Sequence, residues 1–382
     1  MIKFPPLQEY WMPERDSDHD VFEKIFGFWF HENLDLFQDT NAKGILKAVR
    51  EMNIQSVLYD LIRERNISVN FECGWFGDLR TEALQIAGTC AYRQSVIESL
   101  ALQMESAGIV PIWLKGPALG NSVYPRPHWR TYKDLDLLIS SDNWDTTVNL
   151  MLQSGYHSKA CLNWGYLSFE KAFQPDNDIP GSLDVELHLK LSNRSRLNVF
   201  TYQELIEDAV HISNANFPFL IPASAKHFIY LCLHRVGHHS IDRRFAWLMD
   251  LHFLIEKFTH EDWQKLLQFS IQNRVSKIVL SNLKEIKGVF PSAIPNFVFD
   301  KMTKISEEKF EPSEIYLSPK RNKWTDLWTR WQEMPGWLLK FKYLLHWMIP
   351  PKSYLNEAVG HNPILVQHKD RIVNGVKKYF SR

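Results

Sequence analysis

Two aspartates one residue apart, Asp134 and Asp136 in the stretch KDLDLLI, are the pair in this chain best suited to chemistry. On a β-strand, residues i and i+2 point to the same face, which brings the two carboxylates together, ~6–7 Å apart at the backbone. Two neighbouring carboxylates repel each other unless a cation lies between them, and Mg²⁺ prefers such oxygen ligands. The alternative is a pair of exposed acids at a strand end, each paired with a nearby basic side chain.

A third carboxylate lies in the stretch LDVELHLKL, where apolar and polar residues alternate as on a strand with one polar face. Either Asp184 or Glu186 could join the two aspartates, and we favour Glu186 because apolar residues flank it directly. In two-metal phosphoryl transfer, such a third acid binds the second ion and orients or deprotonates the attacking hydroxyl. The sequence therefore predicts a catalytic, metal-binding set of Asp134, Asp136 and Glu186.

The turn WLKGPALG, residues 113–120, precedes these acids and combines Lys115, Gly116 and Pro117. Glycine lets a backbone approach a phosphate closely, and proline can begin a helix whose positive end faces an anion. Lys115 would add a mobile positive charge, although an ordinary turn with a solvated lysine is the alternative. Arg130 precedes Asp134 by four residues and either clamps a phosphate or pairs with the acids.

The elements that must position these residues follow from hydrophobic periodicity and turn residues. The middle of the chain predicts helix, strand, strand, helix, strand, strand at residues 81–107, 109–114, 134–139, 143–155, 166–173 and 182–191, with Ser141 or Asp142 capping the second helix. Residues before about 78 and after 200 show helical periodicity. We expect an α+β protein with a small mixed sheet in residues 79–200, an N-terminal helical region (1–78) and a C-terminal helical domain (201–382).

Several features, in this order, resemble the nucleotidyltransferase superfamily with the DNA-polymerase-beta-like fold, and above all a bacterial group whose acceptors are largely uncharacterised. They are Lys115-Gly116, Tyr124-Pro125, Arg130 before the Asp-x-Asp, Glu186-Leu187-His188, and the later helices with His234 and Asp250. The resemblance covers roughly residues 80–260 and implies a nucleotidyltransferase core with helices around it.

The resemblance also implies a reaction: transfer of a nucleoside monophosphate from a nucleoside triphosphate, with ATP the expected donor, and release of pyrophosphate. Mg²⁺ or Mn²⁺ would bind at the three acids, while Lys115, Gly116 and Arg130 would contact the nucleotide. His234 and Asp250 would line the cleft, with Asp250 binding a basic partner such as His234 or orienting Arg244. The acceptor would be a hydroxyl of a small molecule, a sugar, a peptide or a protein.

A different function remains open at the glycine turn. The usual first motif of the superfamily is an apolar residue, then Gly, then Gly or Ser. Here Lys115 precedes Gly116, and Pro117 follows it. This departure favours a module that binds a nucleotide or metabolite as a sensor without turnover. An RNA-modifying or tRNA-end enzyme is disfavoured, because 44 Lys and Arg balance 44 Asp and Glu and leave no net positive charge for nucleic acid.

The remaining composition bears on location. Four well-separated cysteines without a CxxC pair argue against a zinc knuckle or a disulfide framework and favour a reducing cytoplasm. The N-terminus has prolines and acids where a signal peptide needs an apolar core. The sequence contains no run of about 18 apolar residues, so we expect no membrane-spanning helix. Residues 324–350 are basic and tryptophan-rich, which predicts aromatic packing or, alternatively, a helix lying on a membrane surface.

Overall fold

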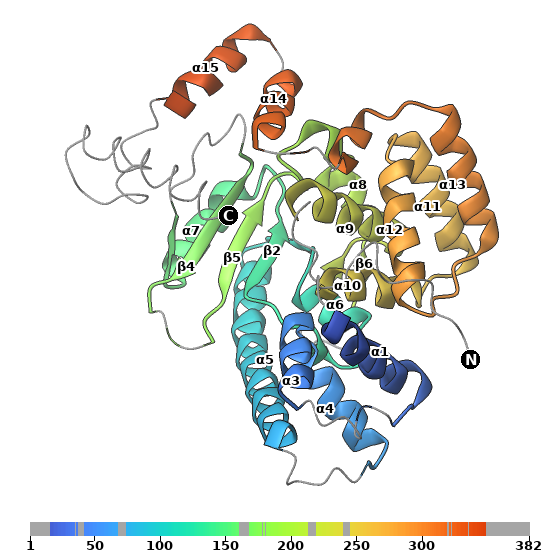
Figure 1. The fold of residues 1–382 in the computed structure, drawn as a ribbon. Helices are drawn as coiled ribbons and strands as arrows, with labels where there is room; N and C mark the ends of the chain where they lie inside the picture. The colour runs from blue at the N-terminus through green and yellow to red at the C-terminus, as the bar shows by residue number, and fades with distance from the viewer. Residues whose placement is uncertain are drawn as a thin grey trace.

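The computed structural model describes residues 16–34, 36, 42–67, 74–159, 168–177, 179, 181–212, 219–239, 245–318, 321, 323–334 and 336–348 (Figure 1). They form an α+β fold around one mixed, seven-stranded sheet with the order β3-β4-β5-β2-β1-β7-β6. The strands are β1 (Ile112–Trp113), β2 (Asp134–Leu138), β3 (Tyr156–Ser158), β4 (Glu170–Pro175), β5 (Asp184–His188), β6 (Val210–His211) and β7 (Leu220–Ile221). The fold class predicted from the sequence is confirmed.

The two central strands, β2 and β5, run parallel, and their alternating residues divide between two environments. Leu135 and Leu137 of β2 and Val185 of β5 are buried in a core shared with helices α5 (Gly74–Ser106) and α7 (Trp144–Gln153). Burial of such branched side chains stabilises a fold by roughly 1.5–3 kcal/mol each. This face fixes the register of both strands, because a slip by one residue would turn the acids into this apolar core.

A second hydrophobic core packs the N-terminal and C-terminal helices together beside the sheet. This core takes buried residues from the N-terminal helices as well as from the C-terminal ones, and it also includes Ile112 and Leu138 of the sheet. The helices outside those named above are α1 (Asp16–His31), α3 (Ala42–Met52), α4 (Gln55–Glu64), α6 (Pro117–Ser122), η2 (Pro127–Trp129), η3 (Ser195–Leu197), α8 (Tyr202–Ile206), α9 (Ser224–His239), α10 (Phe245–Ile255), α11 (His260–Gln272), α12 (Ser276–Val289), α13 (Asn296–Glu308), η4 (Pro312–Leu317), α14 (Lys323–Glu333) and α15 (Trp337–Met348). The division of the chain at residues 78 and 200 stays a prediction.

The structure corrects several boundaries. Helix α5 begins at Gly74 rather than at residue 81, and β1 covers only Ile112–Trp113, after Pro111, whose missing N–H cannot join a strand ladder. Helix α7 has Asn143 as its N-cap, without a side-chain cap bond, in place of Ser141 or Asp142. Strands β3, β6 and β7 were not predicted, because two or three residues are too few to show alternation.

The tryptophan-rich region forms α14 and α15, drawn in orange-red at one end of the molecule in Figure 1. Its aromatic packing is partial: Trp328 stacks on Trp331 and Tyr343 is buried, but Trp324, Trp328 and Trp337 are 65%, 57% and 77% exposed. No helix in the described part of the chain has both the length and the apolar character needed to cross a membrane. Contact of this region with a membrane surface stays a prediction.

The turn between β1 and α6 depends on a glycine. Gly116 has φ 53°, a conformation that L-residues with a side chain rarely adopt. A Cβ at this position would lie 3.1 Å from Cβ of Tyr132 and 3.4 Å from the carbonyl oxygen of Asp134. The turn thus packs directly against the segment that leads into β2.

We expect Gly116→Ala to lower the free energy of unfolding by about 1–3 kcal/mol, because it combines backbone strain with a close approach. Gly108→Ala is the matched control: its φ is 69°, but a Cβ there would meet nothing within 4 Å. Urea unfolding followed by circular dichroism measures both variants, and equal losses would contradict the importance of the contact with Tyr132 and Asp134.

Candidate functional site

The parallel pairing of β2 with β5 brings two of the predicted acids together. Asp136 lies opposite Glu186, and Asp134 lies opposite Asp184. The carboxylate of Asp184 is engaged elsewhere, with Oδ2 3.4 Å from Nζ of Lys159 and 3.2 Å from the amide nitrogen of Gln174. Glu186 is therefore the β5 carboxylate placed beside Asp136.

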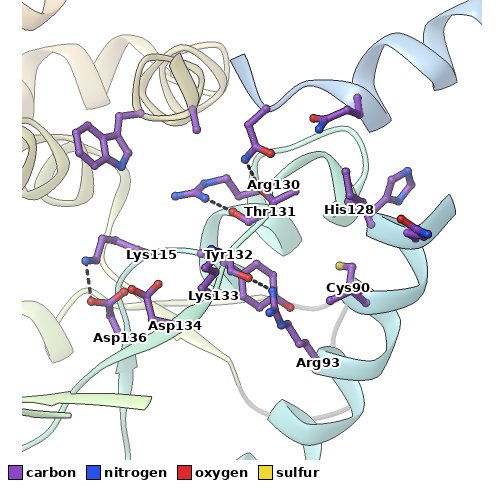
Figure 2. A pocket seen from close by; sticks show the side chains of 18 of the residues that line it. Cys90, Arg93, Lys115, His128, Arg130, Thr131, Tyr132, Lys133, Asp134 and Asp136 are labelled. Atoms are coloured by element: carbon purple, nitrogen blue, oxygen red, sulfur yellow. Dashed lines mark hydrogen bonds and ion pairs between the residues drawn. The ribbon is translucent and has the colours of Figure 1, made fainter. Parts of the chain in front are cut away.

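Asp136 is almost fully buried and is held by a lysine from the glycine turn. The side chain of Asp136 is 1% exposed, and its Oδ1 lies 2.7 Å from Nζ of Lys115, as Figure 2 shows. The same Nζ lies 3.3 Å from Nε2 of His234 on α9. Lys115 is therefore neither a mobile charge nor the solvated lysine of the alternative, because its side chain is only 15% exposed and is ion-paired.

These contacts oppose the effect of burial on ionisation. Burial alone would raise the pKa of Asp136, but the charge of Lys115 and the hydrogen bond from His188 hold it well below its usual range. Burial likewise acts to lower the pKa of Lys115, and the carboxylate of Asp136 raises it above its usual value instead. The pair is therefore fully charged at neutral pH.

His188, two residues after Glu186, completes a cluster on the acidic face. Its Nε2 lies 3.2 Å from Oδ1 of Asp136 and 3.7 Å from Oε2 of Glu186. Its Nδ1 lies 3.8 Å from Oε2 of Glu170, the register partner of His188 on β4. Among the described residues, Asp136, Glu186 and His188 form a group that could hold a metal, with one ligand atom from each within 4.8 Å of the others.

The other two carboxylates have pKa values shifted upward. Desolvation is the main cause at Asp134, and the neighbouring charge of Asp136 adds to it. Desolvation and Asp136 also raise the pKa of Glu186. Three acids on one face therefore do not ionise with equal ease, and Asp136, which has the cationic partners, ionises most readily.

Asp250 contacts Arg130 and Tyr124, and not the predicted partner His234. Its Oδ1 accepts hydrogen bonds from Nε of Arg130 and from the hydroxyl of Tyr124, both at 2.6 Å. His234 contacts Lys115 instead, and Arg244 lies outside the described residues. Arg130 is therefore paired with an acid of α10 and not with the acids of β2.

The segment just before β2 is tied to helices on both sides. Asp60 of α4 contacts His128 at 2.7 Å, the indole N–H of Trp129 at 2.8 Å and Arg126 at 3.2 Å. Arg93 of α5 donates to the carbonyl oxygens of Tyr132, Gly181 (3.0 Å) and Ser182 (3.3 Å), which lie shortly before β2 and β5. These bonds fix the starting points of the two strands that carry the acids.

A cavity of about 560 Å³ opens beside Asp134 and Asp136 (Figure 2). Several predicted site residues line it, namely Lys115, Gly116, Arg130, Asp134, Asp136 and His234. The cavity continues along α5, past Cys90 and Thr89 to Glu82, and reaches Asn53 and Gln55 of the N-terminal region. Its volume lies within the range of about 300–1,000 Å³ that is usual for small-molecule sites.

The sequence therefore located part of the cavity wall: six of the eight predicted site residues line the cavity, whereas Glu186 and Asp250 do not. His188 and Glu170 were not candidates, although the alternation of LDVELHLKL places His188 on the same face as Glu186. The contribution of α5 and of residues 53–55 carried no motif that could have revealed it. The roles assigned to the eight predicted site residues stay predictions.

Comparison with known proteins gives the chain a family context. The sequence model of a family described as an uncharacterised nucleotidyltransferase matches residues 38–291, which is most of the chain. No curated protein sequence matches it. A crystal structure of an antigenic nucleotidyltransferase-like protein from Paracoccidioides brasiliensis is 17% identical over 50% of this chain and 92% of that chain, with a TM-score of 0.29.

The ion pair of Lys115 with Asp136 yields a stability prediction. Lys115→Met should lower the free energy of unfolding by about 3–5 kcal/mol at pH 7, because it leaves a buried carboxylate without its partner. The pKa of Asp136 is depressed in the folded protein, so this contribution is present above about pH 4 and disappears as the pH falls towards the folded value. Urea unfolding with a chelator present, between pH 7 and pH 3, measures it.

Two further variants control this experiment. Lys265→Met removes an exposed ion pair with Glu261 (2.7 Å) and should leave stability unchanged. The double variant Lys115→Met/Asp136→Asn should recover part of the loss, because no buried charge remains. A single variant as stable as the Lys265 control would show that Lys115 does not neutralise Asp136.

Proposed function

This chain belongs to the family of uncharacterised nucleotidyltransferases, and we propose that it transfers a nucleoside monophosphate from a nucleoside triphosphate to an acceptor hydroxyl, releasing pyrophosphate. One observation carries the proposal: the parallel register sets Asp136 beside Glu186, and Asp134 and Asp136 line a cavity that also contains Lys115 and Arg130. Paired carboxylates facing a basic cavity are what metal-assisted phosphoryl transfer requires.

The residues fit a divalent metal, Mg²⁺ or Mn²⁺. Oδ1 of Asp136 contacts Lys115 and His188, whereas Oδ2 is buried and has no hydrogen-bond partner among the described residues. A buried carboxylate oxygen without a partner is costly unless a cation binds it. Asp134, Asp136 and Glu186 would hold the metal, and its charge would screen the negative charge of the phosphates.

The basic residues of the cavity supply the binding site for the triphosphate. Lys115 and Arg130 line the same cavity as Asp134 and Asp136, so a nucleotide there would meet positive charge next to the acids. Helix α6 has only six residues, so its dipole adds little, and the open backbone at Gly116 is the more important feature of the turn. The extension of the cavity along α5 leaves room for the acceptor.

The reaction then follows from positioning. The acceptor oxygen forms a bond to the α-phosphorus, the bond to the bridging oxygen of the β-phosphate breaks, and pyrophosphate leaves. The hydroxyl proton passes to a carboxylate, and the raised pKa of Glu186, caused by desolvation and by Asp136, makes it the better proton acceptor of the β2–β5 pair. The chain contributes mainly by orienting the two substrates.

A labelled-nucleotide experiment tests this function. The protein is incubated with α-labelled ATP, and then with each other nucleoside triphosphate, together with Mg²⁺ or Mn²⁺ and a cell extract as a source of acceptors. We expect label transfer, and we expect Asp136→Asn to reduce it by at least about a hundredfold, because the variant removes a metal-binding charge. Asp184→Asn is the matched control: this acid has the same strand and face as Glu186, but it contacts Lys159 and Gln174 and should change transfer less than about threefold.

Binding measurements separate this function from the sensor. Isothermal titration calorimetry, with each nucleoside triphosphate titrated into the protein, measures nucleotide binding separately from transfer. Tight binding with neither label transfer nor pyrophosphate release would support the sensor instead of the enzyme. The absence of any nucleotide binding would contradict both.

A further inference from the structure

We propose that His188 is a ligand of the metal, and that a centre of Asp136, Glu186 and His188 binds Mn²⁺ or a similar transition-metal ion in preference to Mg²⁺. The inference rests on the proposed function only in placing the metal at Asp136. It replaces an all-oxygen site with a site of mixed nitrogen and oxygen ligands.

The first argument is convergence of ligand atoms. Nε2 of His188 lies 3.2 Å from a carboxylate oxygen of Asp136 and 3.7 Å from one of Glu186. The three side chains offer one ligand atom each within 4.8 Å of one another, a spacing that one ion can bridge. Asp134 is not a member of this group, although it lies on the same face of β2.

The second argument is the carboxylate on the far side of the imidazole. Nδ1 of His188 lies 3.8 Å from Oε2 of Glu170, which the antiparallel pairing of β4 with β5 sets directly opposite. Histidines that bind metals usually direct their second nitrogen to a carboxylate or carbonyl, which fixes the ring and leaves the other nitrogen for the ion. Nε2, which donates to Asp136 in the absence of an ion, would lose that proton when a metal binds and would then offer its lone pair to the ion.

The simpler alternative is that His188 only neutralises Asp136. Lys115 already serves that purpose at 2.7 Å on Oδ1, and a second neutralising group on the same oxygen does nothing for Oδ2. Oδ2 is buried without a hydrogen-bond partner among the described residues. A purely structural histidine leaves this oxygen without a partner, whereas an ion bound between Asp136 and His188 would supply one.

The choice of metal follows from the ligand atoms. Mg²⁺ is a hard ion that prefers oxygen and retains water, and imidazole nitrogen is a poor ligand for it. Imidazole suits Fe²⁺, Ni²⁺, Cu²⁺ and Zn²⁺ best, and Mn²⁺, which suits carboxylates, begins the same transition-metal series. One nitrogen in place of one oxygen therefore shifts the preference away from Mg²⁺.

Electron paramagnetic resonance tests the inference without nucleotide or acceptor. Mn²⁺ is titrated into chelator-treated protein, and the free ion is quantified from its signal. We expect His188→Gln to weaken Mn²⁺ binding by about tenfold or more. Mg²⁺ affinity, measured by displacement of Mn²⁺, should change less than about threefold in the same variant. Spin-echo modulation should show nitrogen coupled to Mn²⁺ in the wild type and lose it in His188→Gln.

Matched variants identify the source of the signal. His157→Gln alters an exposed histidine of the same sheet, whose Nδ1 lies 3.0 Å from Asp176, and His234→Gln alters the histidine beside Lys115. Both should retain the nitrogen coupling. Glu170→Gln should keep the coupling but weaken Mn²⁺ binding, because it frees the ring that Glu170 orients.

The outcomes are separable. If wild-type protein binds Mn²⁺ without nitrogen coupling, or if His188→Gln is folded and binds Mn²⁺ as tightly as the wild type, the inference is overturned. The wild-type spectrum decides the first point even if the variant does not fold. If label transfer depends on Asp136 but the Mn²⁺ spectrum shows no nitrogen coupling, the proposed function stands and this inference falls. If nitrogen coupling is present but no label is transferred, this inference stands and the proposed function falls.

Discussion

Repulsion among three carboxylates on one face of two paired strands is the constraint on which this structure depends. Asp134, Asp136 and Glu186 share that face, and the buried Asp136 remains ionised only because Lys115 and His188 lie against it. Leaving a buried charge unpaired would cost several kcal/mol, a large part of the stability of a typical domain. Lys115, the cation paired with Asp136, is therefore as essential to the site as the acids.

The position of Lys115 explains the unusual Lys-Gly-Pro turn. The lysine must leave β1 in a direction that reaches the buried carboxylate on β2, and the chain must then reverse in a confined space. Gly116 allows this with φ 53°, against Tyr132 and the backbone of Asp134. His227 of α9, whose Nε2 lies 2.6 Å from the carbonyl oxygen of Leu114, holds the residue just before the lysine. The departure from the superfamily motif thus has a structural use, which the sequence alone could not reveal.

What the sequence could predict was local. Alternation of apolar and polar residues placed Asp134 and Asp136 on the polar face of one strand and Glu186 on the polar face of another. The parallel register of β2 with β5 agrees with that placement. The partners of these residues could not be predicted, because they come from distant parts of the chain. Asp250 binds Arg130 across 120 residues, and Lys115 approaches His234 across 119. Spacing within a motif carries no information about such contacts, and the same reason hid the wall formed by α5.

The flanking helices are parts of the site and not appendages to the sheet. The segment from Tyr124 to Tyr132 joins the glycine turn to β2, and its geometry decides where Asp134 begins. It is fixed on one side by Asp250 of α10, and on the other by Asp60 of α4 and Arg93 of α5. Each anchor is a charged or polar group with several partners, so the loss of one frees more than one loop residue. An isolated sheet with its own helices would retain the two aspartates but lose the bonds that aim them, and the match to the family, residues 38–291, spans all three anchors.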